Sequence, residues 1–156
     1  MEKRYSTDVE ESGLKRFDGF HHVILNAPPR LVNPLKVAYH DACHLAHAQR
    51  VRSQPRRLLK SIPGLELIEI LDPEICCGSA GTYNIDQPAI SKKLGREKAA
   101  SIISTGVDIL ALGNIGCEVQ IQRYLREIGS QICVMHTIEL LDFAYRNLDP
   151  LKNGTE

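Results

Sequence analysis

The sequence has 156 residues, of which 19 are basic and 19 are acidic, so its formal net charge is zero. This length suits one domain with a real core, and the balanced charge gives no global attraction to nucleic acid or to an anionic membrane surface. No apolar run approaches the roughly 18 residues of a membrane span, and the polar N-terminus lacks the apolar core of a secretory signal. We therefore expect a cytoplasmic protein without a membrane span and without nucleic acid as a partner.

Short apolar runs alternate with helical patterns along most of the chain. The charged, aperiodic start and the prolines at 28, 29 and 34 indicate an N-terminal arm or linker over residues 1–35, and the composition of 149–156 is that of a C-terminal tail. Strands are expected at 36–40, 65–71, 107–112 and 132–135, and helices at about 55–62, 86–104, 118–128 and 137–148. This alternation predicts one α/β domain over 36–148, with a parallel sheet and helices on its faces.

The most informative stretch covers residues 74–83, which include Cys76 and Cys77 followed by Gly78 and Gly81. Adjacent cysteines suit one zinc ion poorly, because structural zinc sites favour pairs separated by two to four residues. They suit an iron–sulfur cluster better, since neighbouring thiolates can reach different irons. The alternative is that one or both are small buried residues, which is how free cysteines usually behave.

Cys43, Cys76 or Cys77, and Cys117 each follow a predicted strand. In open α/β sheets the carboxyl ends of the strands form the edge where ligands bind, because loops converge there and helix N-termini direct amides at the ligand. Three loops that bring four cysteines to one edge are a more specific signal than any one of them. Cys133 differs, because it lies inside the fourth predicted strand, where core packing is expected. An odd total of five cysteines also suits a disulfide framework poorly.

Three histidines, His40, His44 and His47, flank Cys43. Imidazole can bind a metal or donate a hydrogen bond to a cluster sulfur. His44 follows Cys43 directly and is therefore expected to lie against the cluster. His40 and His47 are equally consistent with ordinary polar positions near the sheet edge.

Three segments together resemble a known family: residues 39–44 (YHDACH), 76–83 (CCGSAGTY) and 113–117 (GNIGC). They are similar to the cysteine-rich CCG domain of the glycolate oxidase iron–sulfur subunit, of lactate-utilisation proteins and of one heterodisulfide reductase subunit. The C-terminal part of the glycolate oxidase subunit is the most similar of these. The resemblance covers about residues 36–148.

This resemblance implies a Rossmann-like fold of about four parallel strands with helices on both faces. It implies an iron–sulfur cluster, of the [4Fe–4S] type, with Cys43, Cys76, Cys77 and Cys117 as metal ligands, and we place His44, Gly78 and Gly81 beside it as cofactor-binding residues. The implied role is electron transfer, as a component of an oxidoreductase complex. The implied partners are a flavin-containing subunit that oxidises a 2-hydroxy acid such as glycolate and a further iron–sulfur domain or chain.

The sequence departs from the family pattern in three ways. The fuller pattern ends in C-x-x-C, whereas Gln120 stands where the second cysteine would follow Cys117. A second copy of the domain and a ferredoxin-like part with C-x-x-C-x-x-C runs are both lacking in this sequence. We therefore expect the terminal domain of a longer protein, a truncated product, or a subunit completed by another chain. Two other functions stay open: a thiol–disulfide redox domain like that of heterodisulfide reductase, and a zinc-stabilised interaction domain without redox chemistry.

Overall fold

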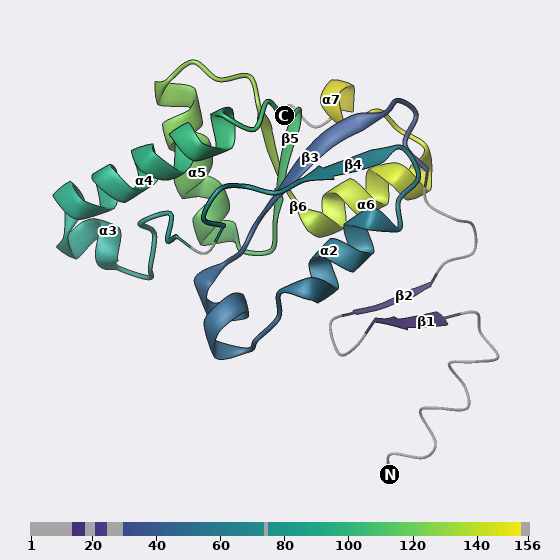
Figure 1. Cartoon of the computed structure of the whole chain (residues 1–156), viewed down its shortest axis with the longest axis horizontal. Coiled ribbons are helices and arrows are strands. Elements are labelled where there is room, and N and C mark those ends of the chain that lie inside the picture. Colours follow the sequence, from purple (N-terminus) through teal and green to yellow (C-terminus); the bar gives the residue numbers. More distant parts are fainter. Residues whose placement is uncertain (1–13, 18–20, 25–29, 74, 154–156) are drawn as a thin grey trace, which may run out of the picture.

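A computed structural model describes residues 14–17, 21–24, 30–73 and 75–153 (Figure 1). Its elements, in chain order, are β1 (Leu14–Phe17), β2 (His21–Ile24), β3 (Leu35–His40), η1 (His44–Ala48), α2 (Ser53–Lys60), β4 (Leu65–Ile68), α3 (Tyr83–Asp86), α4 (Pro88–Ile103), β5 (Ile109–Leu112), α5 (Ile115–Glu127), β6 (Cys133–His136), α6 (Thr137–Arg146) and α7 (Pro150–Asn153). The four predicted strands of the domain are present, although β4, β5 and β6 are each four residues long.

The four strands of the domain form one parallel sheet in the order β4-β3-β5-β6. Ala38 lies opposite both Ile68 on β4 and Leu110 on β5, so β3 has a neighbour on each side. After β3 the chain crosses to β4, which pairs with one side of β3. It later crosses back, and β5 pairs with the other side of β3. This reversal marks the point in open α/β sheets beside which ligands bind. The predicted α/β, Rossmann-like fold is confirmed.

Helices cover both faces of this sheet, as predicted (Figure 1). Along β3 and β5 the side chains alternate: Ala38 and Leu110 pack toward α4 and α5, whereas Val37 and Ile109 pack toward α2 and α6. These strand residues are all fully buried. A parallel sheet that is covered on both faces needs such continuously apolar strands, which is why β5 reads Ile-Leu-Ala-Leu.

Several helix boundaries differ from the sequence prediction for local reasons. Helix α2 begins at Ser53, so Pro55 lies in its first turn, where the missing N–H is tolerated. Helix α5 begins three residues earlier than predicted, at Ile115, because the side chain of Asn114 caps it.

The predicted cap of α6, Thr137, is instead the first residue of that helix. The His136 side chain caps α6 by accepting a hydrogen bond from the Ile138 amide. The short elements η1 and α3 were not predicted.

The segments outside 36–148 carry more structure than predicted. Strands β1 and β2 pair in antiparallel fashion within the expected arm, while residues 1–13 lie outside the described residues. Leu31 is buried, the Arg30 amide donates to the Ala144 carbonyl, and α7 forms within the expected tail. None of the described helices combines the length and the hydropathy that a transmembrane span requires.

Candidate metal centre

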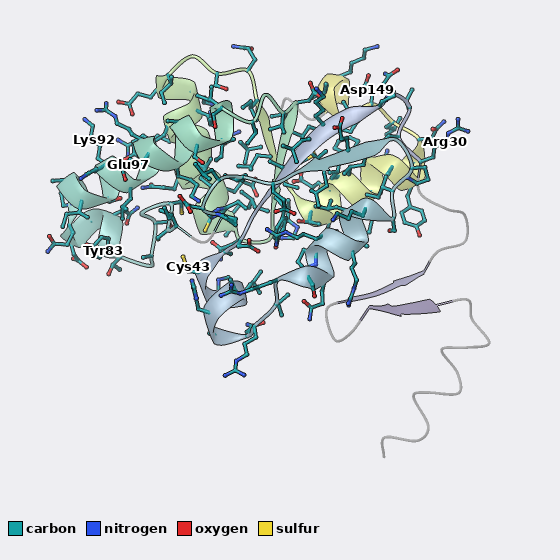
Figure 2. All side chains as sticks on the ribbon, viewed as in Figure 1. Arg30, Cys43, Tyr83, Lys92, Glu97 and Asp149 are labelled. Atoms are coloured by element: carbon teal, nitrogen blue, oxygen red, sulfur yellow. The ribbon has the colours of Figure 1, made fainter. Side chains whose placement is uncertain are left out.

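Three loops at the carboxyl ends of the sheet strands bring four cysteines together. Cys43 follows β3, Cys76 and Cys77 lie in the loop after β4, and Cys117 lies in the first turn of α5, directly after β5. Figure 2 shows Cys43 at the opposite end of the sheet from Arg30 and Asp149. All four cysteines line a pocket of about 350 Å³. The convergence expected from the sequence is therefore present in the structure.

The four thiols form a continuous series of contacts. The side chain of Cys43 hydrogen bonds with that of Cys76, Cys76 hydrogen bonds with Cys77, and Cys77 with Cys117. Cys77 and Cys117 are buried, whereas Cys43 and Cys76 are partly exposed. The described structure therefore presents four sulfur donors in a row, from the inside of the domain to its surface.

Mutual hydrogen bonding and burial keep most of these thiols protonated. The hydrogen bond to Cys117, with burial, raises the pKa of Cys77 to about 11, and the hydrogen bond to Cys77, with burial, raises the pKa of Cys76. Burial also raises the pKa of Cys43, whereas the hydrogen bond from Cys77 lowers that of Cys117. Metals bind thiolates, so a metal that binds at this site at neutral pH has to displace protons from it.

The backbone of the turn at residues 76–78 is fixed against α4. Gly78 has φ +84°, its amide donates to Cys76 Sγ at 3.3 Å, and its carbonyl accepts from Ser91 Oγ at 2.9 Å. Ser91 Oγ in turn accepts from Gln120 Nε2 at 3.0 Å, and both side chains are buried. A Cβ on Gly78 would lie 2.5 Å from the Ser91 carbonyl oxygen. Only glycine fits this position, for reasons of both conformation and space.

Helix α5 directs its N-terminus at the same pocket. The amide of Cys117 donates to Asn114 Oδ1 at 3.0 Å, and both residues line the pocket. The N-terminus of a helix carries partial positive charge, which stabilises thiolate at its first turn. A Cβ on Gly116 would lie 3.1 Å from Ser79 Oγ, so the loop after β4 and the start of α5 are in close contact.

The other predicted site residues divide into two groups. His44 and Gly81 line the pocket: His44 is exposed on η1, and Gly81 has φ +63° with open space where a Cβ would lie. Gly78 instead packs its backbone against Ser91 of α4 and supports the turn from behind. Cys133 begins β6, pairs with Ile109, and packs with the core on the α2 and α6 face, so it is remote from the four other cysteines.

His40 lies at the site, although no sequence pattern ranked it above His47. It is the last residue of β3, is fully buried, and has a ring nitrogen within 4.8 Å of the sulfurs of Cys77 and Cys117. Neither ring nitrogen has a hydrogen-bond partner within the described structure. Burial, together with the charge of Lys98, lowers its pKa to about 4. Strand alternation was the available signal, since it places His40 on the same face as Ala38.

Lys98 is a second residue that the sequence analysis missed. It is only 1% exposed on α4, and its Nζ donates to the carbonyl oxygens of Asp72 at 2.9 Å and Pro73 at 3.4 Å, in the loop before Cys76. Its charge interacts with Cys43, Cys77 and Cys117. Burial lowers the pKa of Lys98. Helical spacing could have indicated the burial of Lys98, because it lies on the same face of α4 as the buried residues Gly95 and Ile102.

The donors at this pocket fit an iron–sulfur cluster or another thiophilic metal. Soft thiolates select zinc, copper(I) or iron–sulfur centres over hard cations such as magnesium or calcium. The fully buried imidazole without a partner gives an independent indication, because buried polar groups in native proteins almost always have one. Cys43, Cys76, Cys77 and Cys117 would hold the metal atoms, and the α5 N-terminus and Lys98 would offset their negative charge.

The fold and the pocket thus define a Rossmann-like domain with a cysteine site at the carboxyl edge of its sheet. The family model for the cysteine-rich domain CCG matches residues 37–122, which is more than half of the chain. The chain belongs to this cysteine-rich CCG family, and the resemblance seen in the sequence is confirmed.

The chain is also similar to curated proteins over about 70% of its length. One is a subunit of "Fumarate reductase (CoM/CoB)" from Methanothermobacter marburgensis, 40% identical over 71% of this chain and 23% of the relative. "Lactate utilization protein A" of Oceanobacillus iheyensis is 34% identical over 69% of this chain and 44% of the relative. "Probable glycolate oxidase iron-sulfur subunit" of Bacillus subtilis is 35% identical over 71% of this chain and 26% of the relative. The chain therefore spans less than half the length of each.

Proposed function

We propose that this chain carries an iron–sulfur cluster on Cys43, Cys76, Cys77 and Cys117 and transfers electrons in a hydroxy-acid oxidising complex. The observation that carries the proposal is the contact series of four thiols from three loops around one pocket. When bound, the cluster, of the [4Fe–4S] type, would supply a one-electron store close to the surface. The name of the Bacillus subtilis relative includes the words iron–sulfur subunit, which supports this cofactor.

The residues of the chain would hold this cluster and stabilise its negative charge. Cys77 and Cys117 would hold it on the buried side, and the Gly78 amide donates to Cys76 Sγ. The cation of Lys98 and the N-terminus of α5 would favour the more negative, reduced state, because opposite charges attract strongly where water is excluded. His44 and Gly81 lie at the pocket wall, where electrons would enter or leave.

The proposed partner is a flavin-containing subunit that oxidises a 2-hydroxy acid such as lactate or glycolate. The names of the Oceanobacillus iheyensis and Bacillus subtilis relatives support this class of substrate. The hydroxy acid would bind to the flavin subunit, which takes two electrons from it and passes them singly to this chain. A further iron–sulfur domain or chain would accept them, and the complex would work in the cytoplasm.

The decisive experiment is a metal and acid-labile sulfide analysis of anaerobically prepared protein, combined with EPR spectroscopy before and after reduction by dithionite. The expected result is brown protein that contains iron and sulfide and has an EPR signal that changes on reduction. Colourless protein that stays metal-free after reconstitution would overturn the proposal. One zinc per chain without iron would assign the site to a zinc-stabilised interaction domain instead.

Thiol–disulfide chemistry is a second candidate function, because Cys77 and Cys117 hydrogen bond through their side chains and the Methanothermobacter relative bears the name "(CoM/CoB)". One thiolate would attack a substrate disulfide and release a thiol, and the second cysteine would displace the other thiol. The resulting Cys77–Cys117 disulfide would be reduced to two thiols by two electrons, one from each of two molecules of a reduced dye, and by two protons from water. Turnover of a mixed disulfide by metal-free protein with reduced methyl viologen would support this function, and its absence would exclude it.

A further inference from the structure

We propose that His40 is a metal ligand at this site and completes a three-donor set with Cys77 and Cys117. This inference deepens the proposed function, since it rests on a metal centre at the same pocket. It assigns to the centre a nitrogen donor from the end of β3, in addition to the four sulfur donors.

The positions of the three donor atoms carry the first step. A ring nitrogen of His40 and the sulfurs of Cys77 and Cys117 all lie within 4.8 Å of one another, and all three side chains are buried. In a tetrahedral site, with metal–sulfur bonds of about 2.3 Å and metal–nitrogen bonds of about 2.0 Å, such donors lie about 3.6 Å apart. A movement of about 1 Å would therefore bring the three atoms around one metal.

The lack of any other partner for the imidazole carries the second step. His40 is fully buried, and both of its ring nitrogens lack a hydrogen bond within the described part of the chain. Its neighbour Asp41, the carboxylate nearest in sequence, accepts hydrogen bonds from Arg56 at both oxygens, at 2.9 and 2.7 Å. Lys98, which acts on His40 through its charge, directs its Nζ at two backbone carbonyls. The protein thus satisfies its other buried polar groups here and leaves the imidazole for a ligand.

The chemistry of the donor carries the third step. Imidazole binds zinc, copper, iron and nickel, so it is compatible with every metal that two thiolates would select. It is a neutral donor when it ligates, and it therefore adds a bond without adding negative charge to a buried site. The backbone of His40 is also held by the sheet, because it pairs with Leu112 of β5.

Anaerobic titration of metal-free protein with Co²⁺ tests this ligand set directly, because Co²⁺ absorption reports the number and kind of donors. We expect a tetrahedral spectrum with thiolate-to-metal charge transfer. His40→Leu should bind Co²⁺ at least about tenfold more weakly and shift the d–d bands. His47→Ala, a change of an exposed histidine on η1, should match the unaltered protein. An identical spectrum and affinity in His40→Leu would overturn the proposal.

Two further measurements separate ligation from a merely structural role. Leucine has a similar volume and His40 has no hydrogen bonds to lose, so metal-free His40→Leu should keep its circular dichroism and melting temperature. If His40→Leu does not fold, His40→Cys is the test instead. His40→Cys should bind Co²⁺ and give a spectrum with stronger thiolate-to-metal charge transfer. Failure of His40→Cys to bind Co²⁺ would overturn the proposal. Iron and sulfide analysis of the unaltered protein tests the proposed function separately, because the Co²⁺ result does not depend on cluster formation.

Discussion

The guanidinium group of Arg56 on α2 donates to both carboxylate oxygens of Asp41, at 2.9 and 2.7 Å. Asp41 is only 4% exposed and lies between His40 and Cys43, so this ion pair fixes the chain where it leaves β3. The same guanidinium hydrogen bonds with Glu69 and lies 5.2 Å from the centre of the Tyr39 ring. One arginine thus orders the segment that carries Cys43, the first of the four cysteines at the pocket.

Replacement of Arg56 by methionine should lower the free energy of unfolding by about 3–5 kcal/mol, because it leaves Asp41 buried without its counter-charge. Urea denaturation of the metal-free protein would measure this loss. Lys60→Met, a change of an exposed cation on the same helix, should stay within about 0.5 kcal/mol. Arg56→Met combined with Asp41→Asn should recover part of the loss. Equal stability of Arg56→Met and Lys60→Met would contradict this account.

Gly78→Ala should disrupt the turn at residues 76–78, because the new Cβ would lie 2.5 Å from the Ser91 carbonyl oxygen. The left-handed backbone adds a penalty of about 1–2 kcal/mol. We expect a loss of stability beyond that penalty and weaker metal binding, both measurable by thermal unfolding and metal titration. Gly106→Ala is the matched control, since Gly106 also has positive φ but open space around it. A smaller effect at Gly78 than at Gly106 would refute the steric argument.

Cys117→Ser should reduce metal binding while the fold persists. Serine oxygen is a harder and far less acidic donor than cysteine sulfur, so one metal bond weakens. The amide of residue 117 still donates to Asn114, and the cap of α5 is therefore kept. We expect near-normal circular dichroism with lower iron content or a degraded cluster. Unchanged iron content and an unchanged EPR signal would show that Cys117, and with it the loop after β5, does not bind the metal.

Cys133→Ser should leave the metal content unchanged. Cys133 is the first residue of β6 and is partly exposed, which differs from the fully enclosed position that the apolar sequence around it indicates. A hydroxyl there can reach water, so we expect a loss of at most about 1 kcal/mol, below the usual cost of an unsatisfied buried group. Chemical denaturation together with iron analysis would check both parts, and loss of iron would make Cys133 a ligand.

Lys98→Met should lower the reduction potential of the bound cluster, because a buried cation stabilises the reduced state. The change also leaves the Asp72 and Pro73 carbonyls without their donor, at a cost in stability of about 1–3 kcal/mol. An EPR-monitored redox titration would measure the potential. Lys92→Met on the exposed side of α4 should leave it unchanged, since solvent screens that charge. A potential equal to that of the unaltered protein would exclude Lys98 from cluster tuning.

The sheet and the cysteine edge could be predicted from the sequence because both depend on local patterns. Apolar runs such as residues 37–39 mark buried parallel strands, and each cysteine loop follows a predicted strand. Helix starts were less accurate, since a cap such as Asn114 depends on which amide its side chain reaches. His40 and Lys98 could not be ranked from the sequence, because their roles depend on burial and on contacts between distant segments.

The parallel sheet also determines when the centre can be assembled. Cys43 and Cys117 come together only when β5 has paired with β3, and the loop with Cys76 and Cys77 is fixed only when Ser91 and Gln120 are in place. Such pairing between distant segments is slow compared with helix formation. A growing chain therefore exposes Cys76 and Cys77 as free adjacent thiols until α5 has been synthesised. During that interval they are open to oxidation, which would remove them as sulfur donors for a metal.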